Sequence, residues 1–177
     1  MKTFRLKDGR ELLIRPAQES DAEAIIDYIN QVGGESNFLT FGKNGCPNDL
    51  KQEKQSIRDM SERPNSIYLL GWVGDELACL ANLHSEIKER LAHNCELGIS
   101  VRKKYWHLGA ASALLTELIA FAEANETLKT VHLDVYGNNE RAIRLYEKFG
   151  FRQAGRLKDY FQVDGSYYDD VIMDLHL

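Results

Sequence analysis

Apolar residues along the chain recur at spacings that are typical of helices in some segments and of strands in others. Between residues 22 and 29 they recur three and four positions apart, which predicts a helix with one buried face. Residues 109–125 and 139–149 show helical spacing as well, and Gly150 suits a left-handed cap after the second of these helices. Between residues 130 and 136 apolar and polar positions alternate, as expected for a strand.

Pairs of turn residues separate the remaining strand-like segments. Asp8-Gly9, Gly74-Asp75 and Asp164-Gly165 predict three hairpins. The expected strands cover residues 4–7, 11–15, 66–73, 77–83, 95–101, 130–136, 160–163 and 167–175.

A capping box and one further helix complete the expected pattern. Ser20 with Glu23 predicts a capping box at the start of the first helix. Residues 50–62 predict a mostly exposed helix with Ile57 and Met60 inward, and residues 31–48 predict a long loop with short helical pieces. The order of elements predicts one α/β (α+β) domain over residues 1–177, with three layers and a central mixed, mostly antiparallel sheet.

Composition is that of a soluble globular chain. Its 177 residues are 44% hydrophobic and 28% charged, and the formal net charge is −5. Without a basic stripe we expect no nucleic-acid partner, and without a long apolar run or a secretory leader we expect a cytoplasmic protein that is not bound to a membrane. The three cysteines and five histidines lack the spacing of a disulfide framework or metal site, so no metal is expected.

A strand, turn and helix between Glu96 and Ser112 carries the first candidate chemistry. The helix begins with the small residues Gly109, Ala110 and Ala111. Unpaired N–H groups at a helix N-terminus can hold a diphosphate, provided that the chain there allows close approach. The alternative is a small-residue helix start that only packs tightly. The spacing matches neither a Walker A loop nor the dinucleotide GxGxxG pattern.

The second candidate segment runs from Asn139 to Phe151. Asn139 is also a good helix cap, and Tyr146 in most proteins would be a core aromatic residue. Together the two segments resemble the GNAT superfamily of N-acyltransferases. The signature Asn-x-x-Ala-x-x-Leu-Tyr-x-x-x-Gly-Phe is complete from Asn139 to Phe151. The signature Gln/Arg-x-x-Gly-x-Gly/Ala matches residues 106–111 except at Trp106, which leaves backbone N–H groups to bind phosphate.

The resemblance implies acetyl-CoA as co-substrate and a bacterial-type GNAT fold. Backbone groups of Ile99, Ser100 and Val101 would lie along the pantetheine arm. The implied diphosphate cradle consists of Trp106, His107, Leu108, Gly109, Ala110, Ala111 and Ser112. Asn139 would contact the cofactor from the next helix, and Tyr146 would place its hydroxyl near the thioester sulfur.

Acetyl transfer to an amine also requires proton transfers. A primary amine with a pKa of about 10.4 is mostly protonated at neutral pH and must lose a proton before it attacks. Glu96 is the candidate base, with an exposed strand carboxylate as the equally weighted alternative. An N–H near Ile99 or Val101 would stabilise the developing oxyanion, and Tyr146 would donate to the departing thiolate.

The acceptor side is less determined by the sequence. We expect it to involve residues 31–48 and the final hairpin, with candidate aromatic residues Phe38, Phe41, Tyr160, Phe161, Tyr167 and Tyr168 and candidate carboxylates Glu35, Asp159, Asp164 and Asp169. Ordinary loop packing is the alternative for each. The implied acceptor is a primary amine of a small molecule, amino acid, polyamine or peptide N-terminus. Two other functions stay open, a transferase for a longer acyl-CoA and a non-catalytic acyl-CoA-binding module, and the resemblance also suggests a homodimer.

Overall fold

The computed structural model describes residues 1–85 and 87–177. Within them, eight strands form one sheet in the order β1-β2-β3-β4-β5-β6-β8-β7. The strands are β1 Lys2–Arg5, β2 Glu11–Pro16, β3 Ile67–Val73, β4 Glu76–Ser85, β5 Asn94–Val101, β6 Thr130–Tyr136, β7 Arg152–Val163 and β8 Ser166–His176. The helices are α1 Ala22–Val32, α2 Leu50–Ser61, α3 Ala110–Glu123 and α4 Glu140–Lys148.

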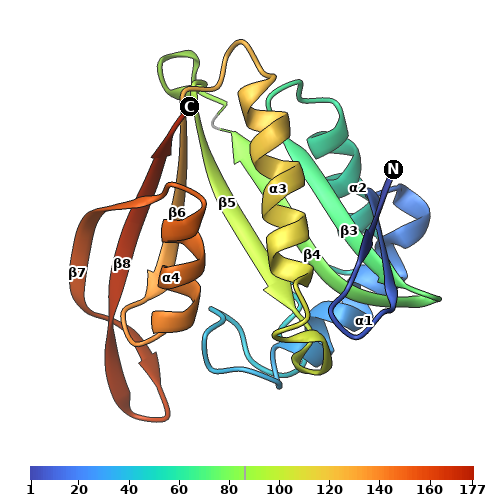
Figure 1. Cartoon of the computed structure of the whole chain (residues 1–177), viewed down its shortest axis with the longest axis horizontal. Coiled ribbons are helices and arrows are strands. Elements are labelled where there is room, and N and C mark those ends of the chain that lie inside the picture. The colour runs from blue at the N-terminus through green and yellow to red at the C-terminus, as the bar shows by residue number, and fades with distance from the viewer. Residues whose placement is uncertain (86) are drawn as a thin grey trace.

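Helices cover both faces of the sheet, so the expected three-layer α/β architecture is confirmed (Figure 1). Helices α3 and α4 pack on one face, where Leu114, Leu118 and Val131 belong to the larger core. Helices α1 and α2 pack on the other face around a smaller core that includes Ile25 and Ile57. The predicted order of elements is confirmed from β1 to β8.

Three local predictions were wrong. Gln18, not Ser20, makes the reciprocal capping contacts, and its partner is Asp21. The Arg15 guanidinium holds that carboxylate through two bonds of 2.7 Å, which fixes the entry to α1. Residues 33–49 contain no helical piece. Strand β7 begins at Arg152 rather than at Tyr160, because it is an exposed edge strand without the apolar alternation that marks buried strands.

Strands β5 and β6 are parallel neighbours that pair at one end and then diverge. Their ladder joins only three residue pairs, ending at Glu96 with His132. Strand β5 stays paired with β4 as far as Val101, and β6 stays paired with β8 as far as Tyr136. The two strands therefore open a V-shaped gap in the sheet, with free backbone edges on both sides.

Candidate active site

A cavity of about 760 Å³ lies at the V between β5 and β6. Side chains of β5 line it alternately from both faces of the sheet. Leu97, Ile99 and Val101 pack with the core under α3 and α4. Ser100 points to the opposite face, where its hydroxyl lies 3.0 Å from that of Tyr28 in α1. The cavity thus connects the two faces, as alternation along a strand requires.

The start of α3 is shaped to receive an anionic group. Gly109 has a φ of 99°, a left-handed conformation that favours glycine, and a Cβ added there would meet nothing within 4 Å. The open space argues against tight packing as the reason for this glycine. The first N–H that bonds back within the helix is that of Ala113, to the carbonyl of Gly109. The N–H groups of residues 110–112 are therefore free to bind an anion.

Trp106 has a structural task at the position where the signature has Gln or Arg. Its indole Nε1 donates to the carbonyl of Val101 at 2.7 Å, which ties the loop to the end of β5. The Arg141 guanidinium lies 5.3 Å from the centre of the Trp106 ring, and Nη1 lies 3.1 Å from Nε2 of His107. Burial lowers the pKa of Arg141 from its ordinary value. Helix α4 thus brings to the loop a cation that Trp106 does not provide.

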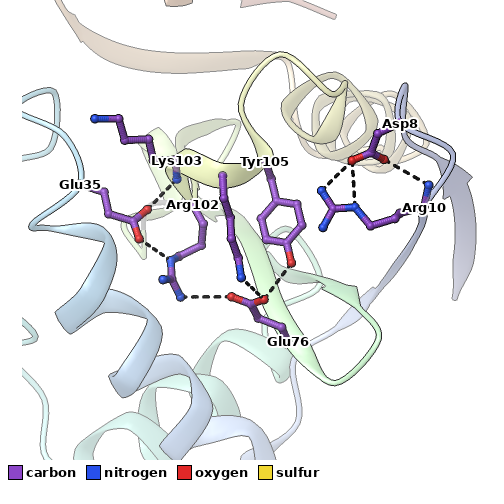
Figure 2. Close-up of polar contacts among 8 residues, drawn as sticks. Asp8, Arg10, Glu35, Glu76, Arg102, Lys103 and Tyr105 are labelled. Atoms are coloured by element: carbon purple, nitrogen blue, oxygen red, sulfur yellow. Dashed lines mark hydrogen bonds and ion pairs between the residues drawn. The ribbon is translucent and has the colours of Figure 1, made fainter.

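A network of ion pairs joins this loop to the segment after α1 (Figure 2). Glu35 accepts from Arg102 Nε at 2.8 Å and from the N–H of Lys103 at 2.6 Å. Glu76 accepts from the Tyr105 hydroxyl at 2.9 Å and also pairs with Lys104. Since both carboxylate oxygens of Glu35 are used here, it is a structural link rather than a free partner for an amine.

Tyr146 lies on the α3/α4 side of the cavity. Its ring packs 5.8 Å from that of Phe151, and only 7% of the residue is exposed. The hydroxyl has no hydrogen-bond partner among the described residues. Burial raises the pKa of Tyr146 to about 12, so the hydroxyl is protonated and available as a donor. Asn139, next to it along the cavity, caps α4 by accepting the N–H of Ala142 at 3.3 Å.

Two carboxylates line the cavity on the opposite side of the sheet, where α1 lies. Glu96 lies at the vertex of the V and Asp134 lies on β6 beyond the last pair of the ladder, and both residues are exposed. Partial burial raises the pKa of Asp134, against the opposing effect of nearby His132. The His132 ring is held by Asp174 through Nδ1 at 2.7 Å. The sequence singled out Glu96 and not Asp134.

Aromatic rings close one side of this half of the cavity. Tyr136 stacks on Phe161 with ring centres 3.9 Å apart, and Phe38 meets Tyr136 edge-on at 6.0 Å. Phe41 and Tyr160 also line the cavity. Tyr167 and Tyr168 lie outside the lining, and Asp169 is engaged by Arg156 at 2.6 Å. The predicted acceptor segments, residues 31–48 and the final hairpin, therefore both reach the cavity.

Comparison with known proteins identifies the family. Residues 37–151 match the model described as the acetyltransferase (GNAT) family. The chain belongs to the GNAT family. The expected acyltransferase class is thereby confirmed, and acetyl-CoA is the acyl donor that GNAT enzymes use.

The names of two relatives of this GNAT chain specify different acceptors. It is 27% identical to the L-amino acid N-acetyltransferase AaaT of Escherichia coli K12, over 92% of this chain and 96% of that protein. It is also 27% identical to the ribosomal protein uS5-alanine N-acetyltransferase of the same bacterium, over 93% and 87%. A GNAT acetyltransferase structure from Streptococcus pneumoniae is 28% identical with a TM-score of 0.91, covering 94% and 99% of the two chains.

The GNAT signatures predict a cofactor loop but do not identify every residue that surrounds it. Arg141 lies within the second signature at a variable position, and Asp134 lies on a strand where its polar side chain only marks the exposed face. Alternation along β6 could have identified Asp134 as a candidate, since it predicts which face of the sheet the carboxylate occupies. In residues 1–85 and 87–177, no cluster of three or more His, Cys, Asp or Glu side chains is arranged to hold a metal ion. No described helix is long and apolar enough to cross a membrane.

Proposed function

We propose that this GNAT chain transfers the acetyl group of acetyl-CoA directly to a primary amine, without a covalent enzyme intermediate. One observation carries the proposal. A single cavity runs through the sheet and joins the start of α3 and the buried Tyr146 hydroxyl to Glu96 and Asp134 on the opposite face. Donor and acceptor could therefore enter from opposite faces and meet at the V.

The cofactor side supplies binding and orientation. The free N–H groups of residues 110–112 would hold the diphosphate, with the Arg141 guanidinium as an additional positive charge. The unpaired edge of β5 at Ile99, Ser100 and Val101 would bond the pantetheine arm as an added strand does. Gly109 leaves the space that this approach needs.

Proton transfers fall to groups on the two sides of the cavity. A carboxylate on the acceptor face would take the amine proton, directly or through water. Asp134 is favoured over Glu96 as this base, because it lies on β6 beyond the last pair of the ladder and because partial burial raises its pKa from the ordinary value. The Tyr146 hydroxyl would donate to the thiolate as it leaves. We further propose that residues 1–177 act as one catalytic domain, while the homodimer and the cytoplasmic location stay predictions.

The test is release of the CoA thiol, with acetyl-CoA and a panel of amines, polyamines, amino acids and peptides. We expect release with at least one acceptor and binding of acetyl-CoA in its absence. Cofactor binding without release to any acceptor would instead support a non-catalytic acyl-CoA-binding module. A higher rate with a longer acyl-CoA than with acetyl-CoA would support a transferase for a longer acyl group.

A further inference from the structure

We propose that the acceptor is a primary amine with no free carboxylate beside it, as in a polyamine or a peptide N-terminus, and that free amino acids are poor acceptors. This inference rests on the proposed function and adds the class of acceptor. It follows from the distribution of charge around the cavity and from the aromatic rings that enclose it.

The acceptor half of the cavity carries negative charge. Glu96 and Asp134 both contribute to its lining. Asp170 follows on β8, opposite Tyr136, and alternation places it on the same face of the sheet as Asp134. Asp170 is only 1% exposed and lies outside the lining, its Oδ1 has no hydrogen-bond partner among the described residues, and burial, together with the charge of Asp134, raises its pKa. An ammonium ion is the group that the surface formed by Glu96 and Asp134 attracts.

Positive charge is confined to the opposite side. Among the lining residues that the structure describes, Arg141 is the one with a cationic side chain, and it lies against Trp106 and His107 beside the cofactor loop. Two other guanidinium groups near the acceptor segments are already paired, Arg102 with Glu35 and Arg156 with Asp169. No cationic side chain therefore lines the acceptor half of the described cavity; outside the lining, Arg63 Nη1 lies 3.5 Å from Nε2 of His84, the ladder partner of Glu96.

A free amino acid holds its carboxylate two bonds from the reacting nitrogen. When that nitrogen lies at the V, the carboxylate must lie close to Glu96 and Asp134, and partial removal from water strengthens the repulsion. An amide at the same position has no charge. It can donate and accept hydrogen bonds, as a peptide bond does, so a peptide N-terminus avoids this penalty.

The aromatic wall favours the same class of acceptor. Tyr136 stacked on Phe161 at 3.9 Å presents a flat apolar surface, and Phe38 extends it at 6.0 Å. Such rings hold cations and the alkyl or peptide portion of a chain, whereas they provide no counter-charge for an anion. The part of the acceptor beyond the amine would lie against these rings.

The experiment compares L-alaninamide with L-alanine, which differ in the charge of one group and in the pKa of the reacting amine. Initial rates of CoA thiol release at pH 8 give kcat/KM for each, calculated for the concentration of the unprotonated amine so that the difference in amine pKa is removed. We expect kcat/KM to be on the order of 100-fold higher for the amide, as a like-charge contact in a partly desolvated site implies. Equal values, or a preference for alanine, would overturn the inference. Absence of release with these two and with the whole amine panel would contradict the proposed function itself.

A variant adds the missing cation. Asn82 lies opposite Gly98 in the β4·β5 ladder and lines the cavity. We expect Asn82→Lys to reduce the preference for the amide by about tenfold or more, whereas Asn82→Gln keeps it as the neutral control. If Asn82→Lys does not fold, Thr40→Lys in the loop wall serves the same purpose. A folded lysine variant with an unchanged preference would refute the electrostatic argument.

Two further acceptors separate the sources of such an amine. Spermidine represents a polyamine, and an alanyl tripeptide amide represents a peptide N-terminus. Neither has a carboxylate beside the reacting nitrogen, so we expect at least one to exceed alanine in kcat/KM. The higher of the two values identifies the source, and values below that of alanine for both would overturn the inference.

Discussion

Replacement of Tyr146 by Phe removes one hydroxyl and leaves the ring in its packed position. The ring contacts Phe151 and is almost fully buried, while the hydroxyl has no hydrogen-bond partner among the described residues. Loss of an unpaired hydroxyl removes no hydrogen bond from the folded state, so the free energy of unfolding should change by less than about 1 kcal/mol. The effect on catalysis should be much larger.

If Tyr146 donates to the departing thiolate, its loss should lower kcat by about 100-fold to 10,000-fold, the range measured for general acids. This corresponds to about 3–5 kcal/mol of transition-state stabilisation. With its pKa raised to about 12, the hydroxyl stays protonated at all pH values of an ordinary assay. The alkaline side of the wild-type pH profile should therefore show no loss of this acid below about pH 11.

Three measurements test this reasoning. Thiol release gives kcat, isothermal titration gives the dissociation constant of acetyl-CoA, and urea unfolding gives stability. We expect a large fall in kcat, a dissociation constant within about threefold of wild type, and unchanged stability. An unchanged kcat would remove Tyr146 from the leaving-group role. A large loss of stability with a proportional loss of cofactor binding would show that the hydroxyl is structural.

Three other substitutions address the remaining assignments. Arg141→Gln should weaken acetyl-CoA binding about tenfold and reduce its salt dependence. The control Arg144→Gln breaks an exposed ion pair on the same helix and should leave affinity and salt dependence unchanged. Equal affinities for the two variants would contradict the role of Arg141. Asp134→Asn should remove the acidic limb of the pH profile of kcat/KM, because a base with a raised pKa is protonated, and activity is lost, as pH falls through its pKa. If the acidic limb persists in Asp134→Asn but disappears in Glu96→Gln, the base is Glu96. Glu35→Gln breaks the pair with Arg102 and should lower the free energy of unfolding by only about 1 kcal/mol, because this pair is partly exposed and screened by solvent. An unchanged urea unfolding curve would show that the pair does not stabilise the fold.

Elements with strong periodicity were predictable from the sequence, and those determined by tertiary contacts were not. Strand β6 matches its expected bounds at residues 130–136, because apolar alternation there reflects one buried face. The early start of β7 at Arg152 could not be predicted, since an edge strand needs only its neighbour and not a buried face. The capping contact of Asp21 depends on Arg15 in β2, which lies outside the local pattern at Ser20.

The loop that we propose to bind the cofactor was predictable for a local reason. Its features, a left-handed Gly109 followed by free N–H groups, arise from consecutive residues. Arg141 was missed because its position over Trp106 depends on where α4 lies relative to the loop before α3, and no spacing along the chain expresses that contact. Glu35 was expected at the acceptor for its charge, but an arginine 67 residues away engages it.

Under the proposed function, alternation along β5 explains how one strand would contact both substrates. Odd-numbered residues such as Leu97 and Ile99 face the core under α3 and α4, while Glu96 and Ser100 face α1. Ladder hydrogen bonds to β4 hold this register along the strand, and departure of β6 frees the other edge. A shift of one residue would exchange the two faces and place a carboxylate beside the cofactor path. The separation of acidic and apolar surfaces therefore depends on the β4·β5 register, which the buried side chains of Cys95 and Leu97 stabilise.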